Sequence, residues 1–243
     1  VPPYQDDELW ELAQRFNGMV VALKRNQEQL VENQRELNEA QIRMLQAQLN
    51  PHFLCNTLDT MKWISKINQV PQVAVMSTDL ADILRFCISP EEFVPLRREA
   101  EILQRYMEIQ HIRMSGAISF RLDLPEELAD CLTPKMILQP LVENSIKHGL
   151  SKESKGGRIF IRTWMRGERL WISVSDTGVG MEEERLQQIR AALNDGTENE
   201  IGIGVGNIYR RVHGLYEDGE MFIYSKKGCG TAVQLAFTPK DIV

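Results

Sequence analysis

The stretch LQPLVENSIKHG, residues 138–149, carries the group of polar residues around which the rest of the sequence can be interpreted. On a helix, Asn144 and His148 lie four residues apart and share one face, and Glu143 and Lys147 stand next to them. An amide oxygen suits a hard cation such as Mg²⁺, and the neighbouring basic groups suit phosphate oxygens. The end of an ordinary solvated helix carries the same residue types, so this stretch alone fits either interpretation.

The stretch SDTGVGM, residues 175–181, directly follows a segment whose pattern predicts a β-strand, Leu170–Asp176. Asp176 ends that strand, and Gly178 and Gly180 let the backbone turn tightly and approach a ligand. A carboxylate at this place can accept a hydrogen bond from an exocyclic amine such as that of adenine. A simple strand-ending turn is an equal alternative for this motif taken alone.

A third stretch, GIGVGN at residues 202–207, leads into a predicted helix, Asn207–Tyr216. Its glycines precede the helix N-terminus, where backbone N–H groups and the helix dipole favour an anion such as phosphate. No G-K-[ST] follows, so the stretch does not fit a P-loop. No Val/Ile-rich strand leads into it, so it does not fit the dinucleotide-binding fingerprint either.

In this order, the three stretches resemble the nucleotide-binding boxes of the GHKL ATPases (gyrase, Hsp90, histidine kinases and MutL). The turn Gly228-Cys-Gly-Thr231 resembles the glycine–threonine element that closes the adenine pocket of that family. The resemblance implies that Asp176 binds the adenine amine, that Asn144 holds Mg²⁺, and that residues 181–201 form a short lid over ATP. The residues implied to contact the nucleotide are Asn144, Lys147, His148, Asp176, Gly178, Gly180, Gly202, Gly204, Asn207 and Thr231.

The segment QAQLNPHFLCNTL, residues 46–58, resembles the phosphoacceptor segment of sensor histidine kinases in the LytS- and YesM-like branch. The resemblance implies that His52 is phosphorylated, because a neutral imidazole has a lone pair that can attack the γ-phosphorus of ATP. A lone histidine between apolar residues would otherwise be interpreted as a buried core residue. Asn56 lies on the same helix face and is a candidate orienting group, and Glu143 is the candidate proton acceptor. Pro51 predicts either a helix start or a kink.

Upstream, apolar residues recur at intervals of seven, at Phe16, Leu23, Leu30, Leu37 and Met44. This heptad pattern predicts a parallel homodimeric coiled coil, and a long helix folded back on its own domain is the alternative. Two antiparallel helices per chain would follow it, which on dimerisation give a four-helix bundle. The expected fold is therefore an all-α dimeric helical hairpin with a coiled-coil entry, followed by an α+β domain that the family resemblance implies to be a Bergerat (GHKL) ATP-binding sandwich.

The start of the chain, DDELWELAQRFNGMV, resembles the last helix of a HAMP linker. The resemblances together imply a HAMP-linker end at 1–25, a coiled coil at 26–48, a phosphotransfer hairpin at 49–92 and an ATP-binding domain at 93–243. In the ATP-binding part, hydrophobic periodicity predicts both helices and strands. The helices expected there are residues 96–115, Pro134–Leu150, Glu182–Leu193 and Asn207–Tyr216, and the strands are Ile118–Leu124, Ile159–Arg166, Leu170–Asp176, Met221–Ser225 and Ala232–Phe237.

The family resemblance implies a function in signalling. The chain would be the cytoplasmic part of a bacterial transmembrane sensor that phosphorylates His52 with ATP and Mg²⁺. It would then pass the phosphoryl group to the receiver-domain aspartate of a response regulator. A catalytically inactive nucleotide-binding module and an ATPase clamp without a phosphoprotein are the alternatives.

Composition excludes several other classes of protein. The net charge of −6 and the lack of a dense Lys/Arg run argue against a nucleic-acid partner. The four cysteines are widely spaced without a C-x-x-C pair, which indicates free thiols in a reducing compartment and no zinc site. No apolar run reaches the roughly 18 residues of a membrane-spanning helix, so the implied membrane anchor would lie outside this sequence.

Overall fold

The computed structural model describes residues 10, 12–21, 24–25, 29, 50–114, 116–150, 156–195 and 203–240. It divides into two compact units, Val1–Leu54 and Cys55–Val243. Residues 12–21 of the first unit are helical, and Phe16 exposes 51% of its surface. The other heptad positions, Leu23, Leu30, Leu37 and Met44, lie outside the described residues. The coiled coil therefore stays a prediction.

Helix α2 (Pro51–Ile67) begins at the proline that interrupts the predicted helical run. The backbone N–H of Phe53 donates a hydrogen bond to Oδ1 of Asn50 at 3.1 Å. Asn50, with a φ of +33°, thus caps the helix, and Pro51 occupies the first helical position, where its missing N–H costs nothing. Of the two alternatives for Pro51, the structure therefore shows a helix start.

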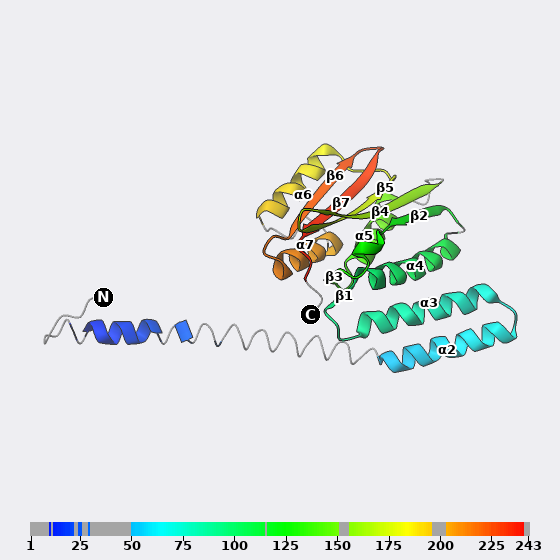
Figure 1. Cartoon of the computed structure of the whole chain (residues 1–243), viewed down its shortest axis with the longest axis horizontal. Helices are drawn as coiled ribbons and strands as arrows, with labels where there is room; N and C mark the ends of the chain where they lie inside the picture. Colours follow the sequence, from blue (N-terminus) through cyan, green and yellow to red (C-terminus); the bar gives the residue numbers. More distant parts are fainter. Residues whose placement is uncertain are drawn as a thin grey trace. The chain divides into compact units, whose positions relative to one another are not determined.

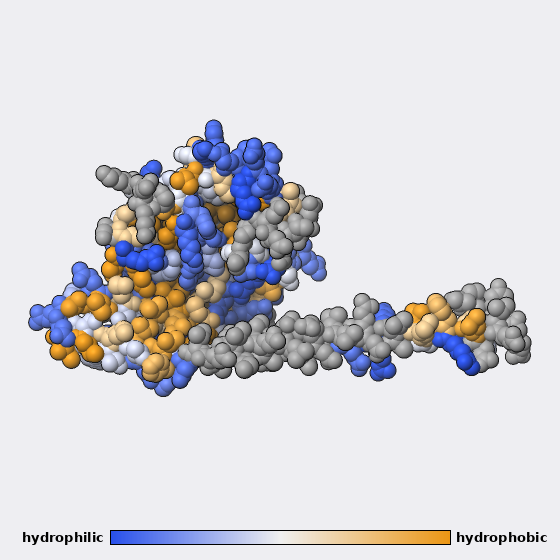
Figure 2. Space-filling model, turned by 180° about the vertical axis from the view of Figure 1, so that it is seen from behind, coloured by the Kyte–Doolittle hydropathy of each residue, from blue (hydrophilic) through white to orange (hydrophobic). Residues whose placement is uncertain are grey.

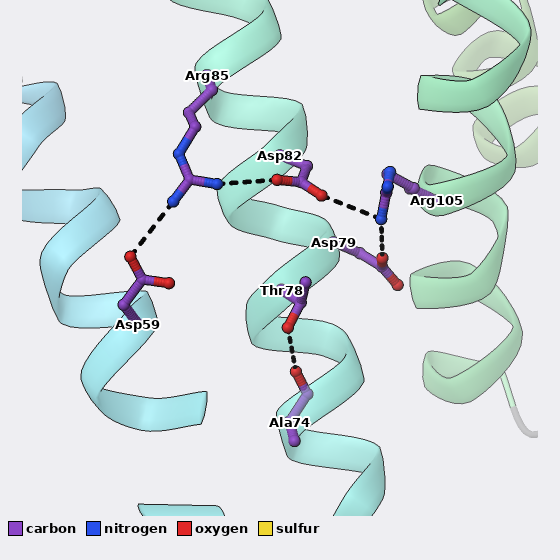
Figure 3. Close-up of polar contacts among 7 residues, drawn as sticks. All are labelled: Asp59, Ala74, Thr78, Asp79, Asp82, Arg85 and Arg105. Carbon is purple, nitrogen blue, oxygen red and sulfur yellow. Dashed lines mark hydrogen bonds and ion pairs between the residues drawn. The ribbon is translucent and has the colours of Figure 1, made fainter. Parts of the chain in front are cut away.

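Helix α3 (Pro71–Ile88) returns from α2 and packs against α4 (Leu96–Arg113), as Figure 1 shows. A small apolar cluster of Ile83, Phe86, Val94 and Ile102 seals this contact. A chain of ion pairs runs alongside it (Figure 3). This chain joins α2, α3 and α4 through Asp59, Arg85, Asp82, Arg105 and Asp79, in that order.

The rest of the second unit is a two-layer sandwich built on a five-stranded sheet in the order β2-β4-β5-β7-β6. The pair β2–β4 is parallel and the other pairs are antiparallel. The strands are β2 (Ile118–Asp123), β4 (Gly157–Arg166), β5 (Arg169–Asp176), β6 (Glu220–Lys226) and β7 (Gly230–Phe237). Two short strands, β1 (Phe93–Pro95) and β3 (Leu132–Pro134), pair antiparallel beside them.

One face of the large sheet is covered by helices, and the main hydrophobic core lies between the two layers (Figure 1). Alternate residues of β4 and β5, such as Ile161 and Ile172, point into this core and are almost fully buried. The covering elements after α4 are η1 (Glu126–Leu128), α5 (Leu138–Asn144), η2 (Ser145–Gly149), α6 (Glu183–Asp195) and α7 (Ile203–Leu215).

The opposite face of the sheet carries a row of aromatic rings. Trp171 stacks on Trp164 with ring centroids 5.8 Å apart and on Phe222 at 5.7 Å. Strand β6 is one edge of the sheet, and the Arg190 guanidinium of α6 donates two hydrogen bonds to the carbonyl of Ile223, at 3.1 and 2.8 Å. This edge is thus partly covered by a side chain.

All five predicted strands are confirmed, and two predicted helices need correction. Residues 134–150 form a shorter helix that starts at Leu138 and widens into a π-helical turn from Ser145. Helix α7 begins at Ile203, so Gly204 lies inside the helix and not in a loop before it. No helix among the described residues is long and apolar enough to cross a membrane.

Candidate functional site

Asp176 forms the floor of the candidate site at the end of β5, where its surface is 7% exposed. Its Oδ1 accepts hydrogen bonds from the N–H groups of Gly178 at 2.9 Å and Thr231 at 3.3 Å. Burial raises the pKa of the Asp176 carboxyl, and hydrogen bonds from Gly178, Ser145 and Thr231 partly offset that effect. A buried carboxylate with a defined orientation is suited to accept a hydrogen bond from a ligand amine.

The loop after Asp176 lies directly against the end of the π-helical turn. A Cβ placed on Gly178 would lie 1.9 Å from the carbonyl oxygen of Gly149, and the N–H of Val179 donates to that same oxygen at 2.9 Å. A Cβ on Gly149 would in turn lie 2.6 Å from Oδ1 of Asp176. The two backbones approach so closely that no side chain fits between them, and this contact joins the first two sequence motifs.

The turn before β7 closes the site from another side. Gly230 has a φ of +89°, and a Cβ there would lie 1.9 Å from the carbonyl oxygen of Asp176. Ser225 ties this turn to the loop after β5, because its Oγ accepts from the N–H of Met181 at 2.8 Å and contacts Oγ1 of Thr231 at 2.9 Å. Gly180, with a φ of +65°, also fits only as glycine.

Ser225 was not among the residues predicted from sequence. It stands in a strand without any motif of its own, and only the fold brings it next to Thr231.

Asn144 and Gly204 bring the first and third motifs together. A Cβ on Gly204 would lie 2.8 Å from both the Nδ2 and the Oδ1 atoms of Asn144. The Nδ2 atom is buried and has no hydrogen-bond partner among the described residues. A buried amide without a partner, beside a glycine of α7, is a group that a bound ligand would satisfy.

The basic residues of the first motif face solvent. Lys147 and His148 are exposed in the π-helical turn, and Lys147 forms an ion pair with Glu143 at 3.7 Å. Glu143 also accepts a hydrogen bond from Gln139 at 3.2 Å. Asn207 is exposed on α7 and is hydrogen-bonded to Arg210. Gly202 lies outside the described residues.

The residues present fit a nucleotide with a divalent cation. Asp176 supplies an acceptor for a base amine, and Asn144 supplies an amide oxygen of the kind that Mg²⁺ binds. Within the described ranges no group of three or more His, Cys, Asp and Glu side chains could hold a metal ion. A cation beside Asn144 would therefore need further oxygen ligands from phosphate groups or water.

His52 belongs to the other compact unit and stands in the first turn of α2, where its side chain is exposed. Asn56, one helical turn further on, is exposed as well. A core histidine, the alternative considered for this position, would be buried, so the structure argues against it.

Both the helical part and the sandwich part of the chain match known protein families. Residues 40–118 match the family described as histidine kinase, and residues 129–241 match the family of histidine kinase-, DNA gyrase B- and HSP90-like ATPases. The sensor histidine kinase YesM of Bacillus subtilis is 33% identical over the whole chain and 41% of its own length. The sensor protein kinase HptS of Staphylococcus aureus is 30% identical over 90% of the chain and 43% of its own length.

The chain spans less than half the length of these curated relatives. Among solved structures, the histidine kinase domain of the blue-light activated histidine kinase EL346 from Erythrobacter litoralis is similar at 20% identity and a TM-score of 0.46. That similarity covers 77% of this chain and 95% of the other.

Proposed function

The chain belongs to the sensor histidine kinase family, and on that premise we propose that it transfers the γ-phosphoryl group of ATP to its own His52. The phosphoryl group then passes to the receiver-domain aspartate of a response regulator. The chain acts as the cytoplasmic part of a bacterial transmembrane sensor, and residues 1–25 form the end of a HAMP linker.

One observation carries this proposal. The chain presents an exposed imidazole at the start of a helix, and elsewhere it folds a site whose buried acceptor, Asp176, suits an adenine amine. The cap by Asn50 and the proline at position 51 hold the first turn of α2 in a defined conformation. A histidine with only a structural role in the core would be buried, and it would not require a nucleotide site elsewhere in the chain.

The chemistry is an in-line displacement at phosphorus. A ring nitrogen of His52 attacks the γ-phosphorus, a P–N bond forms, the bond to the bridging oxygen breaks, and ADP leaves. We assign Glu143 as the group that accepts the imidazole proton and Asn56 as the group that orients the ring. Lys147 and His148 contact the phosphates or the lid, and Asn207 borders the phosphates. Asn144 holds Mg²⁺, which when bound offsets the negative charge of the phosphate groups.

We also propose that the working unit is a homodimer. Several large apolar side chains of the hairpin are exposed in the single chain, and an apolar surface is visible over the hairpin in Figure 2. Two hairpins that bury these faces against each other form a four-helix bundle. Exposed large apolar residues of the hairpin include Met61, Trp63, Ile64, Ile67, Val73, Val75 and Leu80.

Incubation with ATP labelled at the γ-phosphate and Mg²⁺ tests the proposal. The expected product is a label on the protein that is lost in acid and kept in base, as a phosphoramidate requires. His52→Gln abolishes the label, whereas His111→Gln, a matched change at an exposed histidine of α4, keeps it. Nucleotide binding without label would instead support an inactive module, and steady hydrolysis without label would support an ATPase clamp.

A further inference from the structure

Glu99 is a buried acid that the proposed chemistry does not use. It lies on α4, is 3% exposed, and its carboxylate accepts three backbone hydrogen bonds from another part of the chain. Oε1 accepts from the N–H of Met136 at 2.5 Å, and Oε2 accepts from Ile137 at 3.0 Å and Leu138 at 3.1 Å. These three N–H groups begin α5, which has no side-chain cap of its own. Glu99 therefore caps α5 from a different helix.

The turn that Glu99 holds is strained. Met136 has a φ of +63°, a left-handed conformation that is unfavourable for a residue with a Cβ. Such a conformation persists only where surrounding contacts enforce it. The short hydrogen bond from Met136 to Glu99 is one such contact. A second is the adjacent Lys135, whose Nζ donates to the carbonyl and to Oγ of Ser89 at the end of α3.

The position of α5 is thus determined by helices α3 and α4 as well as by its own sequence. Helix α4 is itself fixed to α3 by the ion pair between Arg105 and the buried Asp79 (Figure 3). The same helix carries Glu99 in its first turn, so α4 connects the hairpin to the start of α5.

At its other end, α5 carries two proposed site residues, Glu143 and Asn144. Asn144 is six residues after Leu138, about 9 Å along a helix axis at 1.5 Å per residue. A small tilt at the capped end therefore displaces the Asn144 amide by an ångström or more. Misplacement of about 1 Å in a reacting geometry can cost about 100-fold in rate. Asp176 lies on β5, and its two backbone hydrogen-bond donors, Gly178 and Thr231, lie outside this helix.

We propose that Glu99 is a positioning residue of the nucleotide site: by holding the turn at Met136, it sets where α5 presents Asn144 and Glu143. This inference rests on the proposed kinase function, because it assigns a role in the same site. It connects the helical hairpin to the part of the site that handles the phosphates and the cation.

Glu99→Gln tests the inference, because it keeps the side-chain shape and replaces one acceptor oxygen by an NH₂ group that faces a backbone N–H. We expect the maximal rate of labelling at His52 to fall about tenfold or more. The Mg²⁺ concentration that gives half-maximal rate should rise about threefold or more. The Kd for ADP in EDTA should stay within about twofold of wild type, which also shows that the domain is folded.

The matched control is Glu101→Gln, an exposed acid on the same helix that pairs with Arg98, and it should leave all three measurements unchanged. A glycine at 136 adopts a positive φ without support. Glu99→Gln combined with Met136→Gly should therefore regain about threefold or more of the lost rate.

Three results would overturn the inference: an unchanged rate and Mg²⁺ dependence in Glu99→Gln, a loss of ADP binding in proportion to the rate, or no recovery with glycine. If wild type and Glu101→Gln both bind ADP but neither is labelled at His52, the result contradicts the proposed kinase function. It does not contradict the role of Glu99.

Discussion

The Nη1 atom of Arg105 on α4 lies 3.1 Å from Oδ1 of Asp79 on α3, and Asp79 is only 4% exposed. The other oxygen of Asp79 is buried and has no hydrogen-bond partner among the described residues. Arg105 also pairs with Asp82 at 3.0 Å, so one cation serves two carboxylates of the hairpin. This arrangement makes Arg105 the principal charge partner of a buried acid.

Arg105→Gln should therefore lower the free energy of unfolding by about 2 kcal/mol, because it leaves the Asp79 carboxylate buried without its cation. The value is below that of a fully buried pair because the Arg105 side chain is 39% exposed. Urea denaturation measures the change. Arg98→Gln, which breaks the exposed pair with Glu101, should cost less than about 0.5 kcal/mol. Equal costs for the two variants would contradict the structure.

Nucleotide affinity should fall as the pH is lowered, and the fall should begin at a higher pH than the titration of an ordinary aspartate would give. Burial raises the pKa of Asp176, so this carboxyl protonates at a higher pH than an exposed one and then no longer offers a carboxylate to the adenine amine. The Kd for ADP measured from pH 8 to pH 5 should rise on the acid side. For the stability of the nucleotide-free protein, the effect of pH has the opposite sign. Because the pKa of Asp176 is raised in the folded state, its ionisation opposes folding, and its contribution to the free energy of unfolding falls as the pH rises.

Asp176→Asn is the control for this titration. It should bind ADP at least about tenfold more weakly at neutral pH, since a hydrogen bond to a charged group contributes about 1.5–3 kcal/mol. The acid-side change in affinity should disappear in this variant. If the change persists, another group is responsible.

Gly178→Ala should abolish nucleotide binding. Its Cβ would lie 1.9 Å from the carbonyl oxygen of Gly149, and backbone on both sides leaves no flexible atom to move away. Calorimetric titration with ADP measures the loss. Gly214→Ala is the matched control in α7, where a Cβ meets nothing within 4 Å. That change should keep binding and stabilise the helix by up to about 1 kcal/mol.

Ile64→Glu should convert the proposed homodimer into a monomer. Ile64 exposes 55% of its surface on α2 in the single chain, and a charge there could not be buried between two hairpins. Sedimentation equilibrium measures the assembly. Met165→Glu places the same charge at a 39% exposed apolar residue of β4 and should leave the assembly unchanged. A dimer that survives Ile64→Glu must use another surface.

Regular periodicity made most of the sandwich predictable from sequence. Strand β4 alternates buried and exposed residues over Gly157–Thr163, so its pattern identifies its inner face, although the predicted strand began two residues late, at Ile159. Helix α7 was predicted to start too late, because glycine is a poor helix former and Gly204 suggested a loop. In the structure Val205 and Ile208 pack onto the core, and that tertiary contact outweighs the local preference.

The motifs of the candidate site could be predicted from the sequence, but the contacts that hold them in place could not. Asp176, Gly178 and Thr231 were identified from sequence, and the structure brings them into contact. The carboxylate of Glu99 could not be identified in this way, because its partners lie 37 to 39 residues further along the chain. A charged residue in an amphipathic helix predicts a solvated face, and only the fold shows that Glu99 is buried.

The Arg190 side chain, which lies over the edge strand β6, affects the solubility of the protein at high concentration. An uncovered strand edge is a template on which other chains can add by backbone pairing and grow into insoluble aggregates. The guanidinium occupies the carbonyl of Ile223 and sets a charge at that edge. Replacement of Arg190 would thus reduce the solubility of the protein during expression and storage, even where nucleotide binding is unchanged.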